Sequence, residues 1–195
     1  MTHATADTNS LLASYLELHP EIHARFLNTV SLLEYIGARK ILKSQTASSI
    51  NLDLLTHASE ELRHAWMFKK MALALDPALI SYQEHHLWRG DAATSYFQSL
   101  DRAVASLVTD TRLNYLLTTL LIEERAQGLY SLLPAILDAP HMRTILREED
   151  RHLEIVTQEL KNNHHLAQLR IKETQLFQSL VACWVQRNGD IIGLI

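Results

Sequence analysis

Apolar residues recur every three to four positions through five long segments of the chain, and no alternation typical of a β-strand is sustained. This spacing puts the apolar residues on one face of a helix, so we expect an all-α fold. The predicted helices cover about residues 20–45, 52–75, 103–133, 141–161 and 166–186. Pro20 suits a first helical turn, and the polar stretch from Thr46 to Asn51 can cap the next helix.

The lengths of the connections predict how these helices are arranged. Short connections join the first helix to the second and the third to the fourth, so each pair should form an antiparallel hairpin. About thirty residues follow Asp76, with a short helix expected within Ser81 to Arg89, and this stretch can cross the length of a bundle. We therefore expect one domain, residues 1–195, with a four-helix bundle over about 20–161 and a C-terminal fifth helix.

Composition and charge narrow the classes of function. The fractions of apolar residues, 47%, and charged residues, 21%, are typical of a soluble globular protein. The single cysteine excludes an intrachain disulfide and favours a reducing, cytoplasmic location. We expect neither export nor a membrane span, because the start lacks a signal pattern and no run of 18 apolar residues occurs. Scattered basic residues and a net charge of −4 argue against nucleic acid as a partner.

One short motif occurs twice, once in each predicted hairpin. The fragment Glu60-Glu61-Leu62-Arg63-His64 recurs as Glu148-Glu149-Asp150-Arg151-His152. Residues three apart share one face of a helix, so each Glu-x-x-His can offer an oxygen and a nitrogen to one ion. The residues that share a face with the first of these glutamates are all apolar: Leu54, Ala58, Ala65 and Phe68. A carboxylate on such a face costs several kcal/mol unless a positive charge meets it, which favours a metal site.

Each of the other two bundle helices offers a glutamate on its apolar face. Glu34 is the candidate in the first helix, and the third helix offers Glu123 and Glu124. Aligning the hairpins favours Glu123, since 27 residues separate Glu34 from Glu61 and 26 separate Glu123 from Glu149. Gly37 and Ala126 then correspond, and such small residues should leave space beside the metal ions. The six predicted ligands are Glu34, Glu61, His64, Glu123, Glu149 and His152.

This pattern resembles the ferritin-like diiron-carboxylate superfamily over roughly residues 20–161. The doubled acidic residue and the arginine are similar to the signature of acyl-carrier-protein desaturases and bacterial multicomponent monooxygenases. The resemblance implies two iron ions, and manganese or a mixed pair suits the same ligands. It also implies that Glu148 and Glu60 hydrogen-bond the histidine ligands of the opposite hairpin, His64 and His152 respectively, with Arg63 and Arg151 balancing these carboxylates.

The resemblance implies an oxidase or oxygenase that activates dioxygen and acts on a small, largely apolar organic substrate. Glu34 and Glu123 would then take part by shifting between bridging and terminal binding. Electrons would come from an external donor such as a ferredoxin or a reductase, and the protein would be a homodimer. Iron oxidation, storage or peroxide detoxification, as in ferritins and rubrerythrins, is the alternative. A third class is a helical scaffold without metal, in which the six residues pair among themselves.

Several residues near the predicted ligands have a structural interpretation. His57, one turn before a ligand, is predicted to be a hydrogen-bonded core histidine and not a seventh ligand. Tyr35 and Tyr130 are predicted to pack in the core and not to relay protons or electrons. Cys183 is predicted to be a buried, inert thiol. The residues predicted to line an apolar cavity are Ile41, Phe68 and Leu120.

Overall fold

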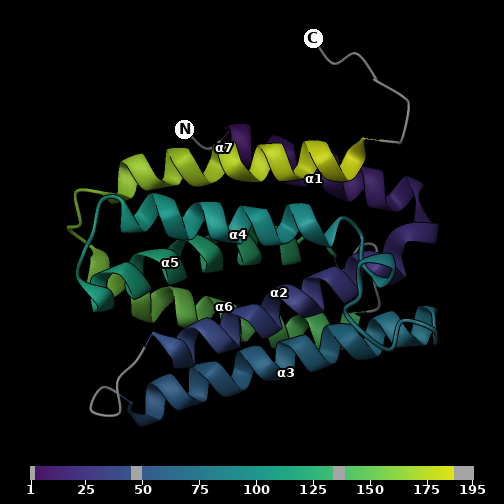
Figure 1. The fold of residues 1–195 in the computed structure, drawn as a ribbon, viewed down its shortest axis with the longest axis horizontal. Coiled ribbons are helices and arrows are strands. Elements are labelled where there is room, and N and C mark those ends of the chain that lie inside the picture. Colours follow the sequence, from purple (N-terminus) through teal and green to yellow (C-terminus); the bar gives the residue numbers. More distant parts are fainter. Residues whose placement is uncertain (1–2, 45–49, 134–138, 187–195) are drawn as a thin grey trace.

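The computed structural model describes residues 3–44, 50–133 and 139–186, and these residues form helices and connecting turns without strands (Figure 1). The helices in chain order are α1 (His3–Leu18), α2 (His23–Lys43), α3 (Leu52–Leu75), α4 (Gly90–Ala105), α5 (Thr111–Tyr130), α6 (Ala139–Leu160) and α7 (Leu166–Val185). Two short 3-10 helices, η1 (Pro20–Ile22) and η2 (Glu84–His86), precede α2 and α4. The all-α prediction is therefore confirmed.

The predicted boundaries are accurate where a polar cap or a proline marks them. The helix predicted from Leu52 to Leu75 is α3, and the side chain of Asn51 caps it by accepting a hydrogen bond from the Leu54 amide at 2.9 Å. Pro20 occupies the first turn of η1, directly before α2. The short helix predicted within the crossover is η2. The remaining polar residues before Asn51, 45–49, lie outside the described residues.

The third predicted helix, over about residues 103–133, is wrong. The structure divides this stretch into the end of α4 and the whole of α5, with a break after Ala105. Asp110 begins α5 by accepting a hydrogen bond from the Leu113 amide at 2.7 Å. Val104 and Val108 are both buried, so the apolar spacing continues across the break and imitates one continuous helix.

Helix α1 is absent from the sequence prediction. Its apolar residues Leu12 and Leu16 lie one turn apart and are each 1% exposed. They join a core that includes Phe26 of α2 and Trp184 of α7, whose rings meet edge to face at 5.6 Å. The C-terminal helix α7 therefore packs on α1 and α4 of its own chain.

Two helix pairs carry the predicted ligands. Helix α2 packs along α3, α5 packs along α6, and α3 also contacts α6. Helix α4 lies within the connection between the two pairs and contacts α2, α5 and α7. Figure 1 shows α1 and α7 along one side of the molecule and α3 along the opposite side. No helix in the described ranges has a stretch long and apolar enough to cross a membrane.

Candidate metal centre

The six predicted ligands converge between the two helix pairs, with α2, α3, α5 and α6 each contributing. All six side chains are buried, none more than 7% exposed. Glu123 points into this cluster from α5, whereas its neighbour Glu124 pairs with Arg170 of α7 near the surface. The sequence leaves the choice between these two glutamates open. In the structure, Glu123 is the one that the fold brings to the cluster.

The donor atoms form two groups that share one residue. Glu34, Glu61, His64 and Glu149 make the first group, which we call the first position. The second position consists of His57, Glu61, Glu123 and His152. Within each group, one donor atom from every residue lies within 4.8 Å of the others. Because Glu61 belongs to both groups, its carboxylate can bridge two ions.

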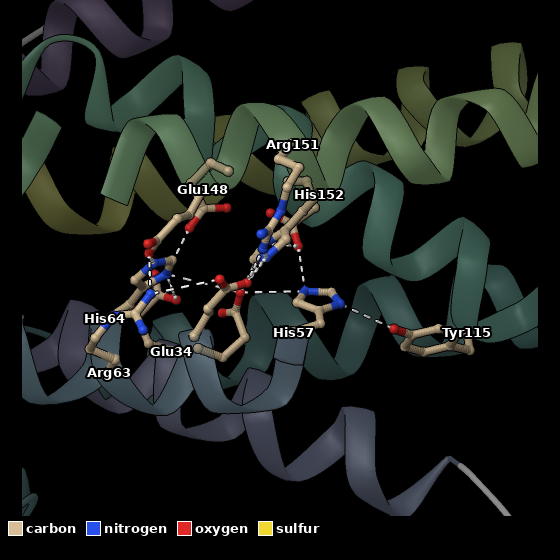
Figure 2. A network of polar contacts seen from close by, with 12 residues as sticks. Glu34, His57, Arg63, His64, Tyr115, Glu148, Arg151 and His152 are labelled. Atoms are coloured by element: carbon tan, nitrogen blue, oxygen red, sulfur yellow. Dashed lines mark hydrogen bonds and ion pairs between the residues drawn. The ribbon is translucent and has the colours of Figure 1, made fainter. Parts of the chain in front are cut away.

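Each histidine of the repeated motif is held from outside by a carboxylate of the opposite hairpin (Figure 2). His64 Nε2 lies 2.9 Å from Glu148 Oε2, and His152 Nε2 lies 2.8 Å from Glu60 Oε2. These are the cross-helix pairs that the motif predicts. When Nε2 donates its hydrogen to the carboxylate, Nδ1 is left with a lone pair that faces the cluster.

The arginines of the motif neutralise these outer carboxylates. Arg63 Nη2 lies 2.6 Å from Glu148 Oε2, and Arg151 Nη2 contacts Glu60 Oε2. Both arginines are partly open to solvent, and Arg151 Nη2 also lies 3.3 Å from His152 Nε2. Each charge-assisted contact therefore connects the surface to a histidine of the cluster and fixes that histidine's orientation.

Some of the inner atoms of the cluster lack a hydrogen-bond partner. Four buried atoms have no hydrogen bond: Glu61 Oε1, His64 Nδ1, Glu149 Oε1 and His152 Nδ1. His64 Nδ1 lies 3.0 Å from Glu149 Oε1, so two acceptors face each other when the histidine donates through Nε2. Buried polar atoms are nearly always paired in folded proteins. A cation between these atoms would satisfy both, so the donor set fits a metal ion.

Burial and mutual repulsion also oppose ionisation of the clustered carboxyls. Burial raises the pKa of Glu34, Glu123 and Glu149 well above the ordinary value of 4.5, and the nearby charge of Glu61 raises each further. Burial alone would raise the pKa of Glu61 too, but the neighbouring side chains of His57, Glu34 and His64 lower it to about 2. Without cations the site would therefore retain protons, which divalent metal ions would replace.

Sequence reasoning assigned His57 to the hydrogen-bonded core, and the structure places it at the second position. Its Nε2 lies 3.1 Å from Glu123 Oε1 and 3.4 Å from Glu61 Oε1. Its other nitrogen, Nδ1, lies 3.3 Å from the hydroxyl of Tyr115, a residue that sequence reasoning missed. The position of His57, four residues before Glu61, was the available signal, because residues four apart share a helix face.

Tyr130 lies in the core as predicted, whereas Tyr35 and Cys183 lie in different surroundings from those expected. Tyr130 is buried and its hydroxyl donates a hydrogen bond to Glu34 Oε1, so its role exceeds core packing. Tyr35 is 37% exposed and stacks on Tyr82, away from the core. Cys183 is only partly buried, in contrast to the fully buried thiol that its apolar neighbours suggest.

Cavities border residues of both positions. One of about 390 Å³ is lined by Gly37 and Ile41 and contacts the ligands Glu61 and Glu123 together with His57. Another, of about 450 Å³, reaches His57 and His152. A third cavity of about 60 Å³ lies against Glu34 and Glu149. Among the predicted lining residues, Ile41 borders a cavity, whereas Phe68 and Leu120 are fully buried in the core.

We compared the chain with protein-family models, with curated proteins and with solved structures, and none of the three comparisons gives a match. The assignment of the centre therefore depends on the chemistry and geometry of its own residues.

Proposed function

We propose that this chain is a ferritin-like diiron protein that activates dioxygen to oxidise a small, largely apolar organic molecule. The four-helix bundle of this class would consist of α2, α3, α5 and α6, with the crossover between its hairpins built from η2 and α4. Iron is the metal that we assign, although manganese suits the same oxygen and nitrogen ligands.

The shared carboxylate of Glu61 is the observation that carries this proposal. It joins two groups of buried donors, each with a histidine whose outer nitrogen is held by a carboxylate. Two divalent ions would neutralise the four carboxylates Glu34, Glu61, Glu123 and Glu149. When bound, a pair of ferrous ions supplies the electrons that reduce dioxygen.

The cavities favour an organic substrate over iron storage. The surface of the 390 Å³ cavity is formed mainly by carbon atoms, although charged residues such as Lys40 and Asp101 also line it. Gly37 borders it beside Glu61, and a Cβ built on Gly37 would lie 3.6 Å from Glu61 Oε2. The volume suits a small molecule, since ligand sites commonly occupy 300–1,000 Å³. An organic molecule in this cavity would contact the ligands of the second position.

The residues around the centre have distinct expected roles. Glu34 and Glu123 each belong to only one position, so either can change its mode of binding without releasing both ions. The Tyr130 hydroxyl donates to Glu34 and would steady that carboxylate. Regeneration would require an external electron donor such as a ferredoxin or a reductase, and a homodimer in the cytoplasm stays a prediction.

The test is to load the metal-free protein with ferrous ion, add dioxygen and follow oxygen consumption, iron per chain and molecular mass. An enzyme should bind about two irons per chain, consume about one dioxygen per pair and stop until reductant is supplied. Its mass should remain that of a small oligomer. Continued oxidation of tens of irons per chain within a large shell would establish the alternative, which is iron storage. Steady consumption of hydrogen peroxide in place of dioxygen would indicate detoxification.

A further inference from the structure

We propose, building on the metal centre assigned above, that its two positions are chemically distinct. His57 would be an additional nitrogen ligand at the second position. That position would bind the first ion more tightly and prefer iron, cobalt or zinc, whereas the first position, rich in carboxylates, would accept manganese.

The His57 ring is oriented with one nitrogen toward the ligands of the second position. Its Nε2 faces Glu123 and Glu61, at 3.1 and 3.4 Å from their Oε1 atoms. The ring centroid lies 4.0 Å from that of His152, so both imidazoles border the same space (Figure 2). The Tyr115 hydroxyl contacts Nδ1 on the outer side. His57 thus has one nitrogen directed at the ligands and the other held from outside, as His64 and His152 do.

The hairpin of α5 and α6 has no histidine at the position that corresponds to His57. The residue four positions before Glu149, matching His57 before Glu61, is Ile145. Ile145 is 0% exposed and belongs to the hydrophobic core. The internal repeat therefore gives each position one histidine together with glutamates. His57 makes the two positions different, because it lies at the second position only.

The two positions differ in the chemistry of their ligands. The first position offers three carboxylates and one imidazole, and the second offers two carboxylates and two imidazoles. Carboxylate ligands suit manganese, whereas imidazole suits iron, zinc, copper and nickel, and affinity rises from manganese toward copper along the first-row series. An additional imidazole therefore increases both the affinity of the second position and its preference for later metals.

The second position is also the more accessible of the two. The two larger cavities, of about 390 and 450 Å³, both border His57. The first position contacts the small cavity of about 60 Å³, and its four residues are all buried. An ion or a substrate that enters by the larger cavities would thus meet the second position and His57 first.

A rival interpretation is that His57 only hydrogen-bonds Glu123 and never binds metal. Cobalt distinguishes a ligand role of His57 from a purely hydrogen-bonding role, because the visible absorption of bound Co²⁺ depends on its ligands.

We would titrate metal-free wild type, His57→Phe and Tyr115→Phe with Co²⁺. The affinity and the absorption spectrum would be measured at each equivalent. Wild type should bind two ions stepwise. In His57→Phe, which keeps an aromatic ring but removes both nitrogens, one of the two affinities should fall at least about tenfold and the spectrum of the first equivalent should change. Tyr115→Phe should have a smaller effect.

A second measurement tests the inference without any variant. Wild type loaded with one equivalent each of Co²⁺ and Mn²⁺ should show cobalt anomalous scattering beside His57 and manganese at the first position. Cobalt at the first position, or equal affinities and spectra in wild type and His57→Phe with two ions bound, would overturn the distinction and leave the metal centre standing. Failure of wild type to bind Co²⁺, Mn²⁺ or Fe²⁺ would overturn the centre as well.

Discussion

His64 Nε2 lies 2.9 Å from Glu148 Oε2, across the contact between α3 and α6. Glu148 is in turn bound by Arg63, so the carboxylate remains charged although it lies against a buried histidine. The histidine and arginine lower the pKa of Glu148 in spite of its partial burial. This pairing fixes which nitrogen of His64 faces the cluster, and the repeat of the motif places the same device at His152.

Replacing Glu60 or Glu148 should weaken metal binding without unfolding the protein. Glu148→Ala removes the acceptor that orients His64, and loss of such a partner typically lowers metal affinity by about 10–100-fold. The amide in Glu148→Gln can still accept a hydrogen bond, so its effect should be smaller. Competition against a chelator measures these affinities.

The matched control is Glu124→Ala, which removes an exposed pair with Arg170 one residue away from a ligand. Metal affinity in this variant should equal that of wild type. Equal affinities in Glu148→Ala and Glu124→Ala would contradict the role assigned to the outer carboxylates.

The metal-free protein should lose stability as the pH rises above about 4.5. Burial raises the pKa of Glu34, Glu123 and Glu149 above that ordinary value, so above it the folded state binds more protons than the unfolded chain. Their contribution is present below pH 4.5 and is lost as the pH rises through the raised pKa values. His152 acts oppositely, since burial and the charge of His57 lower its pKa to about 4. His64, whose pKa Glu149 and Glu61 raise in spite of its burial, acts in the same sense as the three carboxyls, and these four groups outnumber His152.

Thermal unfolding between about pH 5 and pH 8 measures this effect. The Tm of the metal-free protein should fall across that interval. The Tm of the metal-loaded protein should rise relative to that of the metal-free protein as the pH rises, because metal ions and protons compete for the same atoms. A metal-free Tm that increases steadily over the interval would show that the clustered carboxyls are not protonated in the folded state.

Gly37 offers a test of the space beside the centre. Gly37→Ala should be tolerated, because the added Cβ would make an ordinary contact with Glu61 Oε2 at 3.6 Å. Alanine should also stabilise α2 by up to about 1 kcal/mol. Gly37→Leu should fill part of the 390 Å³ cavity and slow oxidation of the loaded ferrous protein by dioxygen, measured by stopped-flow absorbance. Unchanged oxidation in Gly37→Leu with full metal content would mean that this cavity is not the route to the centre.

The buried pair of Arg125 and Glu173 should contribute strongly to stability by joining α5 to α7. Arg125 donates to both oxygens of Glu173, at 2.8 and 2.7 Å, and the Tyr96 hydroxyl donates to the same carboxylate. Glu173→Ala leaves the largely buried Arg125 guanidinium with a long hydrogen bond to Asn9 but without its negative partner, which typically costs about 3–5 kcal/mol. Urea unfolding would measure the loss.

The exposed pair of Arg112 and Glu159 serves as the comparison. Glu159→Ala should cost less than about 1 kcal/mol, since solvent screens such pairs. Similar losses in Glu159→Ala and Glu173→Ala would contradict the structural role given to the buried pair.

The cluster could be predicted from sequence because its main signals are local. The Glu-x-x-His spacing fixes two ligands on one helix face, and the apolar neighbours of Glu61 and Glu149 indicate which face is buried. Glu34 is the one candidate of its helix, and the alignment of the hairpins, with separations of 27 and 26 residues, then favours Glu123. None of these steps requires knowledge of the distances between helices.

The contacts that the sequence could not show depend on those distances. Whether His57 reaches Glu123 is decided by how closely α3 approaches α5, and the same holds for Tyr130 and Glu34 across α5 and α2. The break between α4 and α5 was missed for another reason, because Val104 and Val108 keep a helical spacing through a non-helical turn.

The metal content of the protein tests the central claim most directly. Metal-free wild type would be loaded with excess ferrous ion without oxygen, freed of unbound metal and analysed by mass spectrometry of its elements. We predict about two ions per chain, with a clear reduction in Glu61→Ala, which removes the shared carboxylate, and in His152→Ala. Wild-type content near zero, or two ions retained in both variants, would contradict a metal centre formed by these residues.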